Sequence, residues 1–388
     1  MTGRTINLIN LDHAATESLR AEALRAMLSV WEDPELGNPS ATHGMGRRAR
    51  ARLEAAREEI AACIGAEPQE IFFTGGGTEA DCWALSGTAA ARGNKGSVAV
   101  SAIEHHAVLR AAESLERQGV PVVRVPPDGD VIVSPEAVRA ALAGAPLSPF
   151  LVSVMLVNNE VGTIEPISGI AEAAHAAGAL MHTDAVQAVG HIPVDADGLG
   201  VDLLSASAHK FGGPAGVGFL YIRKGTRIRP LLAGGGQERG LRGGTENLAG
   251  AAGMAAALSA SVREMETECV RLAGLRDWLL SAILAGTEGV RVNGTMRSRL
   301  PGNLHLSIDG ADQNALLTLL DMKGVCASAG SACEAGSTER SHVLAAMGKD
   351  EGQAYLRLTL GRGSTEEETG EAAAVITETI HHLRSMDS

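Results

Sequence analysis

The chain has 388 residues, a length that favours two domains over a single hydrophobic core. Hydrophobic residues make up 45% of the chain and charged residues 20%, which is an ordinary globular balance and excludes a disordered protein. The formal net charge of −13 disfavours non-specific binding to the phosphates of nucleic acids.

No segment of the sequence indicates export or membrane insertion. Residues 1–11 lack the basic start and apolar centre of a signal peptide, and no run approaches the roughly 20 apolar residues of a membrane span. The five cysteines are odd in number and irregularly spaced, which does not suit a disulfide framework. We expect a cytoplasmic protein that binds no membrane, no metal and no nucleic acid directly.

Short apolar strands alternate with alanine-rich helices between about residues 70 and 222. Strands are expected at residues 97–101, 121–125, 150–157, 179–183, 201–205 and 217–222, and helices near 78–92, 105–118, 134–143 and 167–177. Several of these strands are apolar throughout, as strands covered on both faces are. The order predicts an α/β domain with a mainly parallel sheet, and ligands bind such sheets beyond the carboxyl ends of the strands.

The C-terminal half has a different pattern. One long or broken helix is expected over residues 246–285, followed by strands at 303–308 and 355–359 and a final helix at 366–384. Residues 324–337 are mostly Gly, Ala and Ser, a composition typical of a flexible loop. We therefore predict a large α/β domain of residues 15–257 and a small α+β domain formed by residues 1–14 and 258–388.

A glycine-rich segment, Gly75-Gly76-Gly77-Thr78, follows a short apolar strand and precedes a helical stretch. Glycines let a ligand approach the backbone closely, and the free N–H groups of a first helical turn favour a phosphate. Taken alone, this pattern is more typical of an ordinary glycine-rich turn.

Two further motifs follow apolar runs. Lys210 comes after residues 201–204 and suits a Schiff base with an aldehyde cofactor, with Ser207 and His209 as donors to its phosphate. Asp184 ends a strand, where burial requires a cationic partner such as a protonated pyridine nitrogen. A surface lysine and a helix-capping aspartate are the plain alternatives.

Two more candidate segments lie at strand ends. His105 follows the strand at 97–101, where an imidazole is able to stack on a cofactor ring and exchange protons. Asn159 lies in the sequence Asn158-Asn159-Glu160, whose amides suit a ring hydroxyl or a carboxylate, or a simple turn.

Together these motifs resemble the cysteine desulfurases of the NifS and IscS type, in the class-V aminotransferase group of fold-type I pyridoxal phosphate enzymes. The resemblance extends from Asn10 almost to the C-terminus. Its most specific segments are Asn158-Asn159-Glu160, Ala208-His209-Lys210, residues 234–245 and Ser328-Ala329-Gly330-Ser331-Ala332-Cys333.

The resemblance implies a role for each candidate residue. Lys210 is expected to bind pyridoxal phosphate covalently, Asp184 to pair with the ring nitrogen, Gln187 to approach the ring hydroxyl and His105 to stack on the ring. Gly77, Thr78, Ser207 and His209 are expected to hold the phosphate, with Thr245 reaching the phosphate of the other subunit of a homodimer. Asn159 and Arg357 match the positions that bind the substrate carboxylate.

Cys333, in the loop of small residues, is the expected sulfur acceptor. A thiolate is needed to attack the substrate sulfur, and a mobile loop is able to carry that sulfur to a partner. The reaction implied is the conversion of L-cysteine to L-alanine with a persulfide on Cys333, for an acceptor such as an iron–sulfur scaffold. A selenocysteine lyase, a small-amino-acid aminotransferase and a catalytically silent scaffold are the competing hypotheses. Cys326 is interpreted as packing at a strand end.

Overall fold

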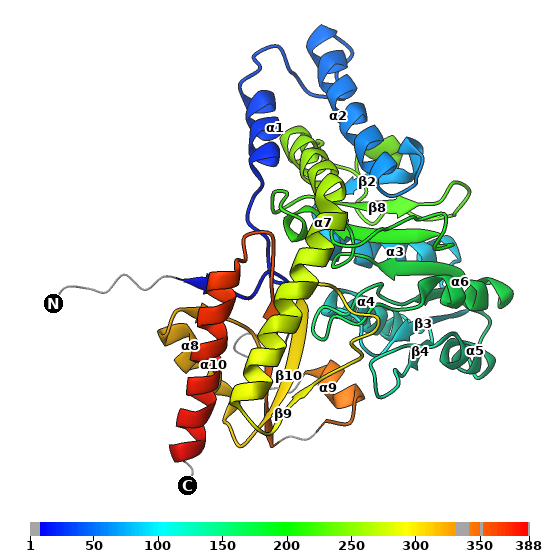
Figure 1. Ribbon diagram of the computed structural model, residues 1–388. Helices are drawn as coiled ribbons and strands as arrows, with labels where there is room; N and C mark the ends of the chain where they lie inside the picture. The colour runs from blue at the N-terminus through cyan, green and yellow to red at the C-terminus, as the bar shows by residue number, and fades with distance from the viewer. Residues whose placement is uncertain (1–7, 331–340, 350–351, 387–388) are drawn as a thin grey trace.

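The computed structural model describes residues 8–330, 341–349 and 352–386, and within them it has an α/β architecture (Figure 1). The central sheet has seven strands in the order β2-β8-β7-β6-β5-β3-β4. Their bounds are β2 (Ile71–Thr74), β3 (Ser97–Ser101), β4 (Val122–Val125), β5 (Pro149–Ser153), β6 (Leu180–Asp184), β7 (Leu203–Ser207) and β8 (Gly218–Ile222). Only β8 runs against the others, so the expectation of a mainly parallel sheet is confirmed.

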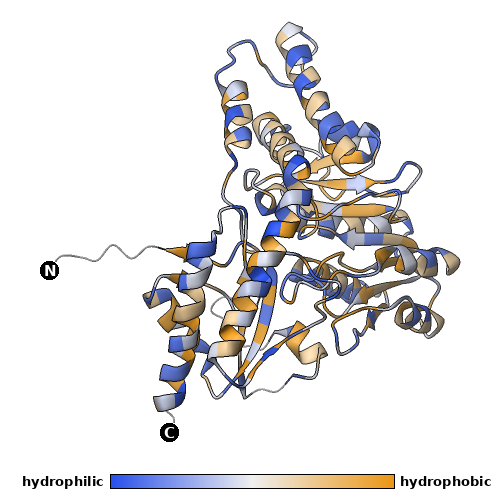
Figure 2. Ribbon diagram, viewed as in Figure 1, coloured by the Kyte–Doolittle hydropathy of each residue, from blue (hydrophilic) through white to orange (hydrophobic). Residues whose placement is uncertain are grey.

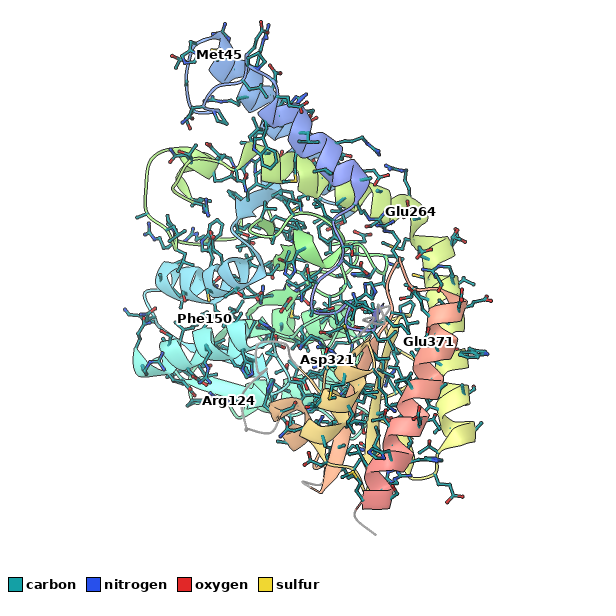
Figure 3. All side chains as sticks on the ribbon, turned by 90° about the vertical axis from the view of Figure 1, so that its left-hand side faces the viewer. Met45, Arg124, Phe150, Glu264, Asp321 and Glu371 are labelled. Atoms are coloured by element: carbon teal, nitrogen blue, oxygen red, sulfur yellow. The ribbon has the colours of Figure 1, made fainter. Side chains whose placement is uncertain are left out.

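Helices cover both faces of this sheet, which is why its strands are buried and mostly apolar (Figure 2). The helices between the strands are α3 (Gly77–Ala91), α4 (His106–Arg117), α5 (Pro135–Ala143) and α6 (Ile167–Ala176). Each matches its predicted range to within one or two residues. Two N-terminal helices, α1 (Ala21–Trp31) and α2 (Gly44–Cys63), pack on a later helix and project beyond the sheet, with Met45 near the far end (Figure 3).

A second hydrophobic core lies around a smaller sheet of order β12-β10-β9. Its strands are β9 (Val290–Val292), β10 (Asn303–Asp309) and β12 (Gln353–Thr359), accompanied by α8 (Gln313–Met322), α9 (His342–Ala346) and α10 (Glu366–Met386). The short strands β1 (Ile9–Asn10) and β11 (Val325–Cys326) pair in parallel beside this core. The N-terminal segment therefore joins the C-terminal elements.

One continuous helix, α7 (Leu248–Gly286), belongs to both cores. Its apolar residues between 248 and 258 pack in the core of the large sheet, and those between 272 and 283 pack in the second core (Figure 1). We propose on this basis that residues 15–257 form one domain and that residues 1–14 and 258–388 form the other.

Three predicted elements differ from the observed ones. The strand expected at 150–157 ends at Ser153, because beyond it the Met155 N–H donates to the Glu104 side chain and the Leu156 carbonyl oxygen accepts from Glu165, so the pairing with β3 is not continued. The strand expected at 201–205 is β7, two residues later, because buried Ser205 and Ser207 continue it. Within the expected loop at 324–337, Val325 and Cys326 form β11, which confirms the strand assignment of Cys326.

The free edge of β2 is covered by side chains from outside the sheet. Glu238 accepts a hydrogen bond from the Phe73 N–H (2.9 Å), and Arg57 and Arg239 donate to the Ile71 carbonyl oxygen (2.6 and 2.7 Å). Arg57 and Glu238 also form a two-bond ion pair of 2.7 and 2.8 Å, with both side chains buried. Because β2 leads directly into Gly75, this ion pair supports the start of the glycine-rich segment.

Among the described helices, none combines the length and apolarity that crossing a bilayer requires.

Replacing Glu238 with Ala is expected to destabilise the fold by about 3–5 kcal/mol, because it leaves the Arg57 guanidinium buried without its anion. Removal of Glu116, whose ion pair with Arg124 is exposed, is the matched control and is expected to cost less than about 1 kcal/mol. Denaturant unfolding of both variants measures the difference. If both variants unfolded at the same denaturant concentration, the buried pair would contribute no more to stability than the exposed one.

Candidate active site

A cavity of about 200 Å³ lies at the carboxyl ends of the parallel strands. Its lining brings together residues from seven separate stretches of the sequence. They are Ala14, Ala15, Gly77, Thr78, Asp81, His105, Met155, Asn159, Asp184, Val186, Gln187, Ser207, His209, Lys210 and Arg357. All the predicted site residues except Thr245 and Cys333 are among them.

Lys210 lies in a short 3-10 turn, Ala208–Lys210, that directly follows β7. Its Nζ donates to the carbonyl oxygens of Ala14 (2.6 Å) and Ala15 (2.9 Å), and its own carbonyl oxygen lies 2.8 Å from His191 Nε2. The N-terminal segment is therefore tied across the cavity to the lysine. The alternative of a surface lysine is wrong, since Lys210 is partly buried and lines the cavity.

Asp184 is the last residue of β6 and is buried. It accepts a hydrogen bond from the Val186 N–H (2.9 Å), so it also shapes a local turn, but the segment that follows is not a helix. Burial raises the pKa of Asp184 above its ordinary value, while the charge of Lys210 acts in the opposite direction. A buried carboxyl group of this kind favours a cationic ligand.

The glycine-rich segment forms a close cradle at the start of α3. Gly76 has φ = 149°, a conformation that side chains rarely adopt, and a Cβ at Gly77 would lie 2.6 Å from Val186. Ser207 and His209 line the cavity with Thr78, beside the N-terminus of this 15-residue helix. The arrangement suits an anion such as a phosphate group.

His105 is the N-cap residue of α4, and its Nδ1 accepts a hydrogen bond from the Ala107 N–H (3.1 Å). Burial lowers its pKa to about 4, with the charge of Lys210 acting in the same direction. The imidazole is therefore neutral at pH 7. A neutral ring beside Lys210 and Asp184 is able to stack on a planar ligand and accept a proton.

Arg357 comes from β12 of the smaller sheet and is fully buried. Its guanidinium donates to Asp12 Oδ1 (2.7 Å) and to the Asn159 carbonyl oxygen (3.0 Å). Its Nε is buried and has no hydrogen-bond partner among the described residues. This donor suits a carboxylate, which would also satisfy its hydrogen-bonding capacity.

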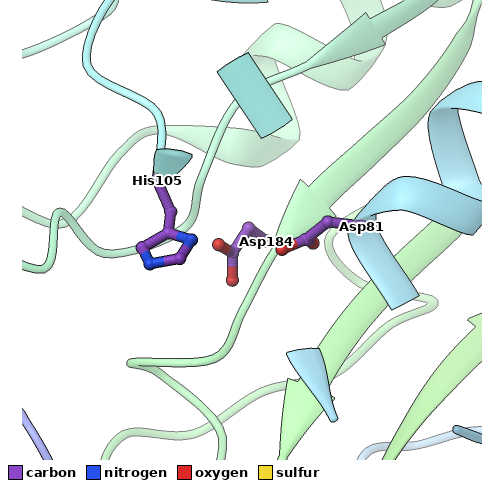
Figure 4. Close-up of side chains that lie close together, drawn as sticks. All are labelled: Asp81, His105 and Asp184. Carbon is purple, nitrogen blue, oxygen red and sulfur yellow. The ribbon is translucent and has the colours of Figure 1, made fainter. Parts of the chain in front are cut away.

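The structure adds Asp81 to the predicted site, a residue of α3 that is 1% exposed. Asp81, Asp184 and His105 each offer a ligand atom, and these atoms lie within 4.8 Å of one another (Figure 4). The sequence signal for Asp81 was weak, because a single aspartate in an alanine-rich helix is usually solvated. Thr245 is exposed and does not line this cavity, and Cys333 lies outside the described residues.

The donor set of the cavity fits pyridoxal phosphate. The cradle at Gly76 and Gly77 suits the phosphate, the buried Asp184 carboxyl suits a pyridinium nitrogen, and the Lys210 amine suits the aldehyde.

Comparison with known proteins gives the same family. The model of the class-V aminotransferases matches residues 9–370. A cysteine desulfurase IscS from Dictyoglomus turgidum is 44% identical over 381 residues, covering 97% of this chain and 96% of the relative. A solved NifS-like protein is 36% identical, with a TM-score of 0.88 and coverage of 97% of this chain and 100% of that one.

A solved structure of SspA in complex with cysteine is also similar, with 31% identity and a TM-score of 0.78. The match covers 90% of this chain and 98% of that one. With the family model spanning nearly the whole chain, the protein belongs to the class-V aminotransferase family, whose members depend on pyridoxal phosphate.

Proposed function

We propose that this protein is a cysteine desulfurase, which converts L-cysteine to L-alanine and retains the sulfur as a persulfide on Cys333. The observation that carries the proposal is the cavity that brings Lys210, Asp184, His105 and Arg357 together. The names of the similar proteins support the choice of substrate, since they include cysteine desulfurases and a protein bound to cysteine.

The proposed cofactor contacts follow from the cavity lining. Gly77, Thr78, Ser207 and His209 would hold the phosphate of pyridoxal phosphate, and Lys210 would bind it covalently. Asp184 would pair with the ring nitrogen, Gln187 would lie near the ring hydroxyl, and His105 would stack on the ring. Bound there, the cofactor would supply an electron-accepting ring that stabilises negative charge on the substrate carbon beside the amine.

Substrate binding is assigned to the other end of the cavity. The Arg357 Nε donor and the side chain of Asn159 would bind the substrate carboxylate. This contact would fix the direction in which the side chain of the substrate points. Asp12 holds the Arg357 guanidinium in place through its 2.7 Å contact. A substrate fixed in this way presents its α-proton to Lys210 Nζ.

Proton transfer is assigned to two residues. The Lys210 amine would remove the α-proton of the substrate. His105, which is neutral because burial lowers its pKa to about 4, is able to accept the thiol proton. Both residues line the same cavity, so neither needs a relay through solvent.

Sulfur transfer is assigned to Cys333. Its thiolate would attack the substrate sulfur as the carbon–sulfur bond breaks, and the bonding electrons would remain on the substrate carbon. That carbon takes up a proton and becomes the methyl group of alanine. The thiol of Cys333 and cysteine thus yield alanine and a persulfide, with no external oxidant or reductant.

A homodimer is proposed from exposed side chains. Thr245 is exposed, and so are Leu24, Leu28 and Trp31 of α1, and exposed apolar side chains suit contact with a second copy of the chain. The resemblance to IscS-type proteins supports a cytoplasmic enzyme that delivers sulfur to an iron–sulfur scaffold or to another thio-cofactor or tRNA pathway.

Two variants test the proposed reaction. Lys210→Ala is expected to lose the covalent cofactor adduct that borohydride traps, and Cys333→Ala is expected to keep that adduct but lose sulfide release. The measurements are mass spectrometry of the reduced protein and assays of alanine and sulfide with a thiol reductant. Full sulfide release by Cys333→Ala, or pyruvate formation in place of alanine, would contradict the proposal.

Arg357→Lys is expected to raise the KM for cysteine about tenfold or more, with a smaller effect on kcat. Lysine keeps the charge but loses the planar donors that bind a carboxylate. Arg124→Lys, on the exposed edge of the sheet, is the control and is expected to change neither constant. A variant with normal KM and reduced kcat would instead place Arg357 in the chemical step.

His105 is expected to titrate near pH 4 in the cofactor-free protein, far below an ordinary histidine near 6.5. Because burial lowers its pKa, the ring is neutral above about pH 5 and gains a proton only in stronger acid. Nitrogen NMR of the imidazole groups measures this titration, and His105→Gln identifies the signal by its loss. A His105 signal that titrates between pH 6 and 7 would show a solvated ring.

A further inference from the structure

Asp81 is a second buried carboxyl group behind the candidate cofactor position. It comes from α3, whereas Asp184 comes from β6, and Asp184 lies between Asp81 and His105 (Figure 4). Asp81 is 1% exposed and Asp184 is 3% exposed. Ligand oxygens of the two carboxyl groups lie within 4.8 Å of each other.

No cation is available to neutralise Asp81 among the described residues. His182 Nε2 lies 3.6 Å from Asp81 Oδ1, beyond a hydrogen bond, and this oxygen has no hydrogen-bond partner there. The two ring nitrogens of His182 already contact Ser153 Oγ (2.8 Å) and Ser205 Oγ (3.0 Å). Burial lowers the pKa of His182 to about 3, so its ring is neutral.

The other ionisable groups around Asp81 favour its protonated form. Glu104 is fully buried and accepts hydrogen bonds from Ser101 and Met155, its charge would also raise the pKa of Asp81, and His105 is neutral. The positive charge of Lys210 acts on Asp184. Burial is the main reason that the pKa of Asp81 lies well above its ordinary range, and the charge of Asp184 raises this pKa further. The hydrogen bond from the Ser205 hydroxyl acts in the opposite direction.

Two carboxylates this close at a buried site do not ionise together, because each charge raises the free energy of the other. We propose that Asp81 is a positioning residue that stays a neutral carboxylic acid behind Asp184, so that Asp184 alone carries the negative charge of the pair. The part of this inference that concerns the cofactor rests on the proposed function. The protonation of Asp81 does not.

The pair thus presents one negative charge, which matches one positive charge on a protonated ring nitrogen. If both groups were ionised, the second charge would hold a proton on any ligand nitrogen more tightly. Replacing Asp81 with Asn keeps a neutral group of the same shape, whereas replacing it with Ala leaves a void beside Asp184.

Infrared spectroscopy of the full chain, labelled with ¹³C at the aspartate side-chain carboxyl groups, tests the charge of Asp81 directly. The label separates aspartate from buried Glu104 and Glu165. At pH 7 we expect one labelled band of a protonated acid, with or without cofactor, which disappears in Asp81→Asn. Asp202→Asn is the control at another buried aspartate and is expected to keep the band. The absence of the band, or its survival in Asp81→Asn, would overturn the proposal.

A second measurement follows the protonation of the bound cofactor through its absorption. The absorption of the loaded protein is titrated with pH, and its midpoint in Asp81→Asn is compared with that of the wild type. If Asp81 is neutral in the wild type, the two midpoints are expected to be nearly the same. If Asp81 carries a negative charge, its loss in Asp81→Asn would lower the midpoint by about one pH unit or more. Asp81→Ala is expected to weaken cofactor binding about tenfold, whereas Asp81→Asn is expected to bind the cofactor as the wild type does. If no cofactor binds at all, the proposed function fails while the infrared result still decides the state of Asp81.

Discussion

The parallel strands of the central sheet end at one edge, and this constraint places the groups of the active site. The ends of β6 and β7 deliver Asp184 and Lys210, and the turns after β3 and β5 deliver His105 and Asn159. Because the strands are buried on both faces, their register is fixed by apolar packing on each side. The candidate site residues are therefore held at the ends of strands that are buried on both faces.

The smaller sheet completes the cavity from the opposite side. Arg357 lies in β12, and its backbone pairs with Ser328, which precedes the segment that contains Cys333. The helix α7 is packed in both hydrophobic cores, so it ties the position of Arg357 to that of Lys210. The proposed substrate-binding and cofactor-binding residues thus come from two cores joined by one helix.

The sequence predicted most of this arrangement because its signals were local. Apolar runs bounded by glycine or polar residues marked the strands, and Asp184 and Lys210 stood directly at strand ends. Asp81 was missed because its burial depends on how α3 packs against β7, which its neighbours in the sequence do not reveal. The shift of β7 by two residues has a similar cause, since Ser205 and Ser207 are buried although both are polar, and hydropathy does not register this.

We propose that cysteine loses its sulfur in the Lys210 cavity and that Cys333 receives it. A single turnover of the loaded wild-type protein with one equivalent of L-cysteine, in the absence of reductant, tests this claim most directly. The account predicts one alanine per active site and one added sulfur atom on the peptide that contains Cys333, as mapped by mass spectrometry. Alanine formed with the added sulfur on another cysteine, or with free sulfide and no modified peptide, would contradict it.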